Sequence, residues 1–191
     1  PTESITVEGG VTVLPERFPD IIAAYRINGD FGFVKVATLF RELRYETDKA
    51  RSLPSYGITV MTAIHVAAND KLKFQGVMGT GVARYIQGAS GLNYDAITNG
   101  TDELEELQMW GSNFSYQHFW KEHVHSSLTV GVLNVEDNDN LADTKYKSGY
   151  YGSVNVFWDV VKNFTFGAEV VAGERININD DRGSAVRLQM N

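Results

Sequence analysis

The sequence predicts an all-β fold, an antiparallel up-and-down transmembrane β-barrel to which this chain contributes about ten strands. Three observations predict it. Long segments alternate apolar and polar residues with a period of two, the connections between these segments alternate short and long, and aromatic residues gather at the ends of the apolar faces. No helical periodicity competes with this pattern.

The alternation is clearest between residues 147 and 191. Val154, Val156 and Trp158 share one face of the first strand in this stretch, while Ser153 and Asn155 share the other. Successive side chains of a strand point to opposite faces. An apolar face that ends in aromatic rings, opposite a face of small and polar residues, is typical of a barrel with lipid outside and water inside. From this stretch alone, a soluble sandwich is the open alternative.

The other strands follow from the same alternation and from the turn residues between them. The first is interrupted at Gly9 and Gly10, and it ends where Pro15 and Pro19 exclude a ladder partner. The fifth expected strand contains glycines at 76, 79 and 81, which have no side chain and therefore allow a bulge or a close backbone approach. The expected strands are 5–14, 21–28, 31–45, 56–68, 71–86, 105–120, 125–134, 147–158, 164–173 and 186–190.

The connections separate into two kinds. Short turns are expected at 29–30, 69–70, 121–124 and 159–163, and longer loops at 46–55, 87–104, 136–145 and 177–183. Outer-membrane barrels have short periplasmic turns and longer external loops, whereas a Greek-key sandwich has no reason to alternate in this way.

Aromatic side chains divide between the two ends of the strands. Trp110 and Tyr150 lie nearer long loops, and Trp120, Trp158, Phe164 and Phe166 lie beside short turns. Ten residues separate Trp110 from Trp120, which is about 33 Å along a strand and about 25 Å of height for a tilted one. These six residues therefore predict two aromatic girdles around an apolar band. The alternative is that the rings are ordinary core aromatics.

Composition excludes several classes of site. The chain has no cysteine, so thiolate metal sites, disulfides and thiol catalysis are ruled out. Its net charge of -7 disfavours nucleic acid as a partner. No P-loop, serine elbow or zincin motif is present, so we expect no catalytic residue, cofactor or metal. His118, His123 and His125 lie near one turn, where interfacial histidines are favoured over a metal site. Residues 137–141 resemble the start of a calcium-binding loop, but Leu141 supplies no oxygen ligand and the glycine that follows in such loops is missing.

Charged and polar side chains on the second face predict the wall of a water-filled pore. A cationic wall concentrates small anions. The alternative is that these cations only pair with neighbouring carboxylates such as Glu169. The expected pore-lining residues are Arg26, Lys35, Arg41, Arg84, Asn155, Glu169, Arg187 and Gln189.

Four segments carry a resemblance to a known family. They read PERFPDIIAAYRINGDFGFVKVATLFRELRYE (15–46), GVMGTGVARYI (76–86), FSYQHFWKEHVHSSLTVGV (114–132) and SVNVFWDVVKNFTFGAEVVAGERININDDRGSAVRLQMN (153–191). The chain resembles the DcaP-like family of trimeric bacterial outer-membrane porins over most of its length. The resemblance implies a larger barrel of about sixteen strands, a homotrimer and passage of small anionic compounds.

The ends of the chain differ from that family pattern. The chain starts at Pro1 without an initiator Met, and it stops at Met190-Asn191 rather than on an aromatic residue. The family's early strands have no counterpart. We therefore expect one β-barrel domain over residues 1–191 that is the incomplete, C-terminal portion of a longer barrel, in an excerpted or processed chain.

Three functions compete at this point. The first is a porin of the bacterial outer membrane that lets small, anionic solutes diffuse, in contact with membrane lipid and lipopolysaccharide. The second is a structural or ligand-binding outer-membrane barrel without channel activity. An outer-membrane enzyme built from scattered residues is the least favoured, because no catalytic motif supports it.

Overall fold

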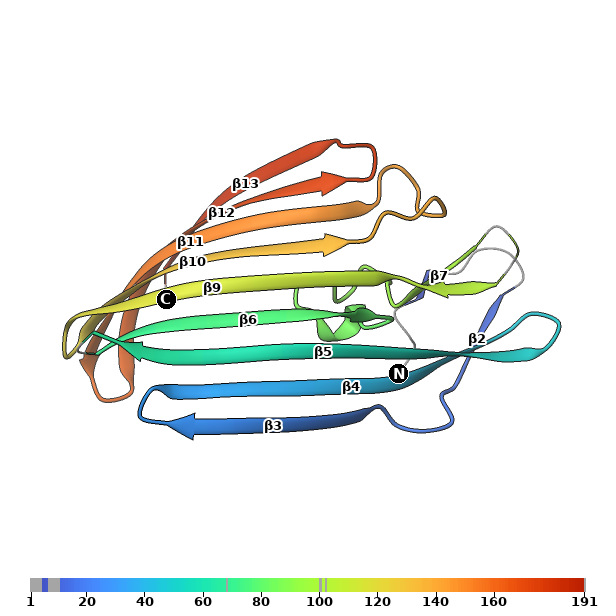
Figure 1. The fold of residues 1–191 in the computed structure, drawn as a ribbon. Coiled ribbons are helices and arrows are strands. Elements are labelled where there is room, and N and C mark those ends of the chain that lie inside the picture. The colour runs from blue at the N-terminus through green and yellow to red at the C-terminus, as the bar shows by residue number, and fades with distance from the viewer. Residues whose placement is uncertain (1–4, 7–10, 68, 100, 102, 191) are drawn as a thin grey trace.

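The alternating segments form one large antiparallel sheet in the computed structural model of the chain (Figure 1). The structure describes residues 5–6, 11–67, 69–99, 101 and 103–190. Its strands are β1 (Ile5–Thr6), β2 (Thr12–Leu14), β3 (Ile21–Gly29), β4 (Gly32–Glu46), β5 (Ala50–Val66), β6 (Asp70–Thr80), β7 (Ala96–Thr98), β8 (Leu104–Glu106), β9 (Gln108–Lys121), β10 (Val124–Val135), β11 (Tyr146–Val161), β12 (Phe164–Asn177) and β13 (Arg182–Met190).

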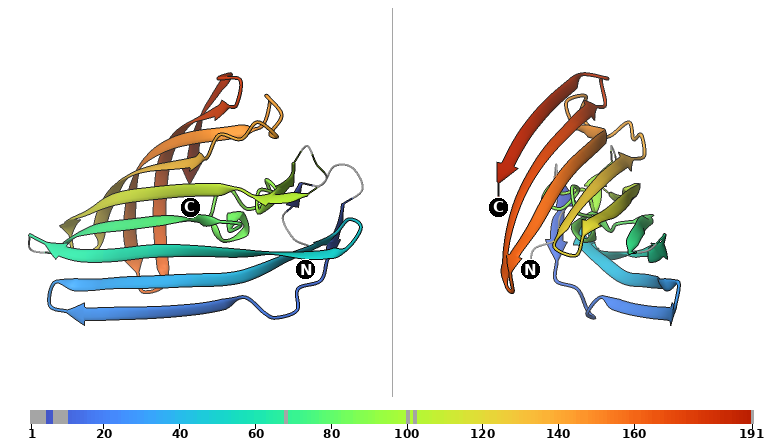
Figure 2. Two further views of the ribbon diagram at one scale, coloured as in Figure 1. Left: turned by 45° about the vertical axis from the view of Figure 1, so that its right-hand side comes forward. Right: turned by 90° about the vertical axis from the view of Figure 1, so that its left-hand side faces the viewer.

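The large sheet is a meander with one inserted segment. Its order is β13-β12-β11-β10-β9-β6-β5-β4-β2, and β3 also pairs with β4. From β3 onwards each strand of this sheet pairs antiparallel with the next one along the chain, except that residues 81–107 intervene between β6 and β9. Strands β2 and β3 both pair with β4, β2 at its loop end and β3 along the rest. Figure 2 shows the sheet curved like a trough, with β3 and β13 at opposite rims. This is the antiparallel up-and-down arrangement that the alternation predicts.

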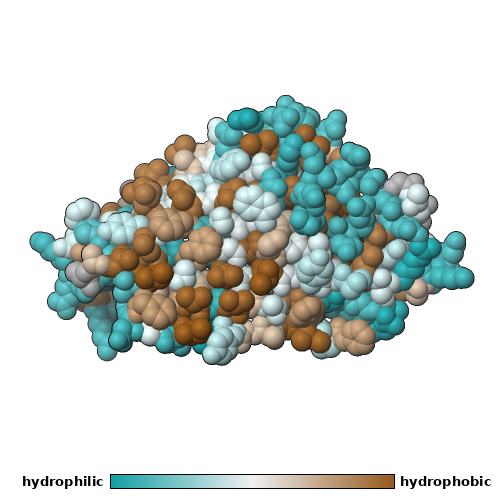
Figure 3. Space-filling view, viewed as in Figure 1, coloured by the Kyte–Doolittle hydropathy of each residue, from teal (hydrophilic) through white to brown (hydrophobic). Residues whose placement is uncertain are grey.

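One face of the sheet is apolar and exposed. In register across six strands lie Leu72, Tyr116, Leu128, Val154, Val170 and Leu188. Leu128, Val154 and Leu188 are 53%, 57% and 63% exposed. In Figure 3 apolar side chains gather over the middle of the strands, with polar residues towards both ends. Such a patch is far larger than water-soluble proteins leave uncovered, so this outer face is suited to contact lipid.

The opposite, inner face receives the segment between β6 and β9. The chain turns off the sheet at Gly81, which has φ +63°, and then forms the short 3-10 helix η1 (Ala83–Tyr85). We call residues 81–107 the inward loop. Its buried side chains pack on inner-face residues of the sheet such as Leu39, Met109 and Val135. The largest buried apolar cluster of the described residues therefore lies between the inward loop and the wall.

The inward loop also carries a second, small sheet. It has the order β1-β7-β8, with β1 parallel to β7 and β7 antiparallel to β8. The expected first strand, 5–14, is wrong as a single strand, because β1 joins this small sheet and β2 joins the large one. Residues 7–10 between them lie outside the described residues. No helix among the residues described is long and apolar enough to cross a membrane.

Two further expected boundaries differ markedly from the structure. Residues 46–55 were expected as a loop, but they form the tip of a long β4–β5 hairpin whose connection is only 47–49. The charged residues Glu42, Arg44 and Glu46 alternate with the buried residues Leu43 and Tyr45, so the hairpin is amphipathic in water.

The second wrong boundary is that of the expected strand 71–86. It ends at Thr80, because the chain leaves the sheet at Gly81, and residues 83–85 are helical. The expected 87–104 loop likewise contains the short strand β7 and the first residue of β8.

Candidate functional site

The inner face of the sheet is polar between the inward loop and the short turns. One lateral row runs Lys73, Ser115, Thr129, Ser153, Val171 and Arg187 across β6, β9, β10, β11, β12 and β13. The Thr129 hydroxyl donates to the Ser115 hydroxyl at 2.9 Å. This row places a line of hydroxyls between two cations, Lys73 at one end and Arg187 at the other.

The adjacent row, towards the short turns, is built from amides and one carboxylate. It runs Lys71, Gln117, Ser127, Asn155, Glu169 and Gln189. The Ser127 backbone N–H donates to Asn155 Oδ1 at 2.8 Å, and Asn155 Nδ2 lies 3.5 Å from Glu169 Oε1. Asn155 therefore orients Glu169, which is the acidic side chain of this row.

Arg26 and Lys35 face each other on β3 and β4. The Arg26 guanidinium carbon lies 3.9 Å from the centroid of the Phe33 ring, and its Nε donates to Asn28 Oδ1 at 2.7 Å. Contact with the ring face holds the guanidinium against the wall while its charge persists. Arg26, Lys35, Lys71, Lys73 and Arg187 thus share this part of the inner face with the carboxylate of Glu169 and, nearer the short turns, that of Asp159.

Arg41 lies on the same face of β4 but meets a different environment. Its side chain is 0% exposed, and its Nη atoms lie 2.9 Å from Asp95 and 2.9 Å from Glu16. Asp20 is 3.4 Å from its Nε, and Nη1 also donates to the Gly81 carbonyl at 3.2 Å. We call Arg41 and these three acids the Arg41 cluster. Three carboxylates compensate the buried guanidinium, so Arg41 fastens the inward loop to the wall.

The acids of the Arg41 cluster come from two interruptions of the sheet. Glu16 and Asp20 lie in the gap between β2 and β3, where Pro15 and Pro19 end the pairing with β4. Asp95 lies in the inward loop, where it accepts a hydrogen bond from the Arg84 backbone N–H at 3.2 Å. A single β4 side chain therefore joins two segments that are distant in sequence.

Electrostatics in the inward loop follow from its burial. Burial raises the pKa of the Asp95 carboxyl, and the Arg41 guanidinium opposes that rise. Partial burial, together with the hydrogen bond that its hydroxyl donates to Asp20, raises the pKa of Tyr85 to about 12. Tyr85 therefore stays protonated and keeps its donor role across the physiological pH range.

The expected pore-lining residues fall into two groups. Arg26, Lys35, Asn155, Glu169, Arg187 and Gln189 lie on the inner face by register. Arg41 lies on that face but is enclosed, and Arg84 lies on η1 rather than on a strand, with Nη1 3.9 Å from Glu16. Strand alternation alone cannot separate an enclosed arginine from a water-facing one. The role of the eight residues in lining a pore stays a prediction.

Sequence reasoning missed several residues of this face. Lys71 and Lys73 could have been found, because they alternate with Leu72 and Phe74 in an expected strand. The partners of Arg41 carry no local signal, since Asp95 is 54 positions away.

The six expected girdle residues all lie exposed. Trp110 and Tyr150 are 45% and 52% exposed near the loop ends of β9 and β11. Trp120, Trp158, Phe164 and Phe166 lie at the turn ends of their strands, where Trp158 faces Phe166 across β11 and β12. Trp120 Nε1 donates to the Ser126 hydroxyl at 2.9 Å. Their action as membrane girdles stays a prediction.

The three histidines near one turn do not share a site. His118 Nδ1 lies 2.8 Å from Asp70, whose carboxylate also accepts from Tyr116 and the Phe119 backbone N–H. His125 instead stacks between the rings of Phe119 and Phe157 at 5.3 and 5.4 Å, on the inner face. No group of ligating side chains among the described residues could hold a metal ion.

Comparisons with known proteins agree with this architecture. The family model of the DcaP outer membrane protein matches residues 2–191. The outer membrane channel DcaP of Acinetobacter baumannii superposes with a TM-score of 0.82 at 17% identity, over 98% of this chain and 54% of the channel. The chain therefore spans about half of that channel. The NanC porin gives a TM-score of 0.46 at 7% identity, over 90% of this chain and 98% of its own. No curated protein matches.

Proposed function

The chain belongs to the DcaP outer membrane protein family, and from that premise we propose that it forms part of the wall of a porin. Small solutes diffuse along its inner face through water. The protein lies in the bacterial outer membrane, as its family does. The observation that carries the proposal is the inverted polarity of the sheet, which exposes its apolar rows outward and lines its inner face with hydroxyls, amides and cations.

The sheet is proposed to be one part of a larger closed barrel. Strands β3 and β13 each have one neighbour among the described residues, and nearly all of their side chains are exposed. Open edges are not stable in a bilayer, because lipid cannot satisfy the backbone groups. Further strands would complete the wall. The assembly proposed for the complete protein is a homotrimer in contact with membrane lipid and lipopolysaccharide.

Small anions are the proposed solutes. Five cations on the inner face, Arg26, Lys35, Lys71, Lys73 and Arg187, outnumber the carboxylates described on the same part of that face, which are those of Glu169 and Asp159. A surplus of positive charge along a narrow aqueous path raises the local concentration of anions. The overall charge of -7 does not oppose this, because the cations of the wall act at short range in a screened medium.

Single-channel recording of the complete protein in planar bilayers tests the proposal. We expect stable ohmic steps and a reversal potential that favours anions in a salt gradient. Absence of conductance from correctly folded protein would overturn the porin assignment. It would favour a structural or ligand-binding barrel without channel activity. Conductance without ion preference would retain the porin and remove the anionic solutes.

Reversing the charge of Arg187 should weaken anion preference. For an anion about 8 Å away in water, Arg187→Glu removes an attraction and adds a repulsion that together amount to about 1 kcal/mol, or about a fivefold change in local concentration at low ionic strength. Reversal potentials in a salt gradient measure it. The matched control is Arg182→Glu, since Arg182 lies on the outer-face side of the same strand and pairs with Glu174. Equal shifts from both variants would refute the placement of Arg187.

A further inference from the structure

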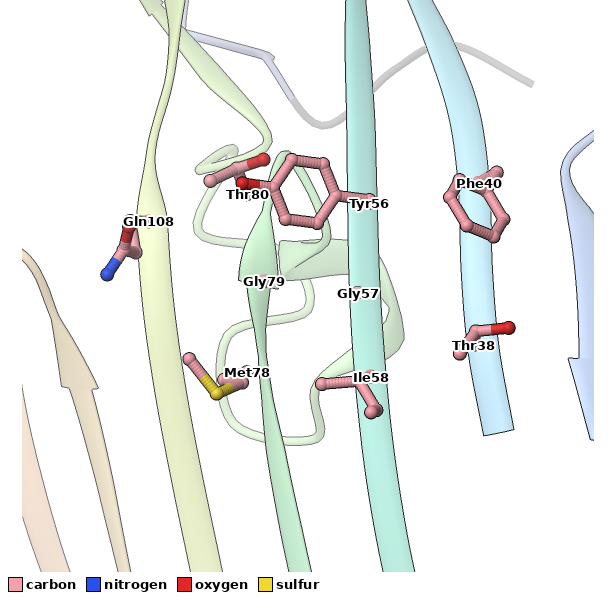
Figure 4. Close-up of a pocket in the computed structure, with 9 residues that line it drawn as sticks. All are labelled: Thr38, Phe40, Tyr56, Gly57, Ile58, Met78, Gly79, Thr80 and Gln108. Atoms are coloured by element: carbon pink, nitrogen blue, oxygen red, sulfur yellow. The ribbon is translucent and has the colours of Figure 1, made fainter. Parts of the chain in front are cut away.

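The outer face carries a shallow groove that solute passage does not use. It lies towards the loop end of β4, β5, β6 and β9 and has a volume of about 220 Å³. Its main walls are the side chains of Phe40, Tyr56, Ile58, Met78, Thr80 and Gln108. In Figure 4 the Tyr56 ring extends towards Thr80, the Ile58 side chain points towards β6, and the Met78 side chain extends towards β9. The groove is therefore apolar on its turn side and polar at its loop-side rim.

The floor of the groove is bare backbone. Gly57 and Gly79 pair across β5 and β6, and a Cβ on either would project towards Val82 of the inward loop. Nothing but backbone thus separates the two rows of outer side chains here. Small-molecule pockets usually measure roughly 300–1,000 Å³, so this groove suits a segment of a flexible chain better than a compact ligand.

Its position identifies the kind of chain. The groove continues the exposed apolar face of the sheet, which contacts lipid in an outer-membrane protein. It opens towards the long connections, and in outer-membrane barrels these face the cell exterior. The chain that reaches it is therefore an acyl chain of the outer leaflet.

Arginines lie immediately above the groove on the same side. Arg44 is four residues beyond Phe40 on β4, about 13 Å along the strand. Arg17 is held against Glu42 and donates to the Ser52 hydroxyl at 3.0 Å, while its side chain stays 54% exposed. Glu42 accepts from Nε and Nη2 of the guanidinium and Ser52 accepts from Nη2, so the Nη1 side is the one that points away from these partners. A guanidinium keeps its charge beside such partners, and a charge-assisted hydrogen bond from it to a phosphate oxygen is stronger than a neutral one.

We propose that this groove is a lipopolysaccharide site, with an acyl chain lying over Gly57 and Gly79 and a phosphate of the lipid at Arg17 and Arg44. The proposal deepens the lipid contact proposed above and rests on the outer-membrane location. It does not depend on conductance, because every residue invoked lies on the outer side of the wall.

The test compares lipid retention by matched variants of the complete protein, purified from outer membranes in mild detergent. Native mass spectrometry counts lipopolysaccharide per chain, and purified lipopolysaccharide is titrated onto lipid-free protein with phosphatidylethanolamine as comparator. Ile58→Trp fills the groove, and Leu128→Trp places the same ring on the exposed outer face of β10. Arg17→Gln removes the cation proposed to contact the phosphate. Arg182→Gln is its control, because it removes an outer-face cation from β13 instead.

We expect Ile58→Trp to weaken lipopolysaccharide binding roughly tenfold through lost acyl-chain contact, and Arg17→Gln to weaken it roughly tenfold through the lost charge, while both control variants bind as the wild type does. Phosphatidylethanolamine should bind weakly, and Arg17→Gln should leave its binding unchanged. Equal binding by groove and control variants would overturn the site. The site would also be overturned if Ile58→Trp altered the oligomeric state and left the amount of bound lipopolysaccharide unchanged. That result would assign the groove to contact with a second copy of the chain. Conductance should stay unchanged, so a failed porin assignment is recognised separately.

Discussion

Replacing Arg41 with alanine should release the inward loop and widen the aqueous path. The guanidinium lies between Asp95, Glu16 and Asp20, and it also donates to the Gly81 carbonyl where the loop begins. Its removal takes the nearest cation from three partly or fully buried carboxylates, of which Glu16 keeps the more distant Arg84 at 3.9 Å. Breaking a buried ion pair from one side costs about 3–5 kcal/mol, which is enough to make the anchored position of the loop unfavourable.

Two measurements follow the release of the loop. Single-channel conductance of Arg41→Ala should exceed that of the wild type, with more frequent transitions between levels. Hydrogen exchange of the backbone amides of Tyr85, Ile86 and Ala89, which hydrogen-bond within the loop, should accelerate. Conductance and exchange rates of Arg41→Lys should lie between those of the wild type and Arg41→Ala. A lysine keeps the charge but lacks the planar guanidinium that contacts the separate acids.

The matched control is Arg44→Ala. Arg44 is three residues further along β4 on the opposite face, and it donates to the Pro15 carbonyl at 2.9 Å rather than to the inward loop. Its loss should leave conductance unchanged. Combining Arg41→Ala with Asp95→Ala should cost less than the sum of the single changes, because the second removes a carboxylate that the first leaves unpaired. Identical conductance and exchange in wild type and Arg41→Ala would contradict the anchoring role.

Strand alternation predicted the faces of the sheet because the register shifts of β9 and β11 lie near the ends of those strands. From Trp110 to His118 the outward positions of β9 follow one another in constant register, and β10 continues the same rows. Each row crosses several strands in register, so one correct strand assigns the faces of its neighbours. This is why the inner position of Arg187 and the outer position of Leu188 could be read from the sequence.

Alternation failed where the chain leaves the membrane or the wall. Around 46–55 the charged residues and Pro54 suggested a loop, whereas the residues continue β4 and β5 as a paired hairpin whose inner side chains are packed. At Gly81 the chain departs from the sheet, and glycine is compatible with a bulge, a close approach or an exit. Nothing in the period of two distinguishes these three outcomes.

The contacts of Arg41 could not be predicted because they depend on tertiary structure. Its face follows from counting along β4, but Asp95 reaches it only after the inward loop has folded onto the wall. Glu16 and Asp20 reach it because two prolines interrupt the edge pairing opposite that position. The same residue type on the same face is therefore enclosed by carboxylates at Arg41 and exposed at Arg187.

Adding one methyl group at Gly79 should disturb the wall where the inward loop is seated. A Cβ at this position would lie 2.4 Å from the Tyr56 carbonyl oxygen, 2.7 Å from Gly57 Cα and 3.0 Å from Val82 Cγ2. Two of these atoms are backbone of the neighbouring strand and cannot rotate away. Gly79→Ala must therefore separate β5 from β6 locally or displace Val82 from its contact with the wall. Overpacking of this kind lowers the free energy of unfolding by about 1–3 kcal/mol or more.

The expected result is a lower unfolding temperature in detergent for Gly79→Ala, measured by the loss of the β-sheet circular dichroism signal, together with a changed single-channel conductance. Gly152→Ala is the matched control, because Gly152 lies inside β11 and its added Cβ would meet the Thr129 carbonyl oxygen at an ordinary 3.7 Å. That variant should melt at or above the wild-type temperature, since alanine suits a strand interior better than glycine. If both variants melted alike, the close approach at Gly79 would not be what seats the loop. A lower unfolding temperature for Gly79→Ala with unchanged conductance would mean instead that the sheet yields while the loop holds.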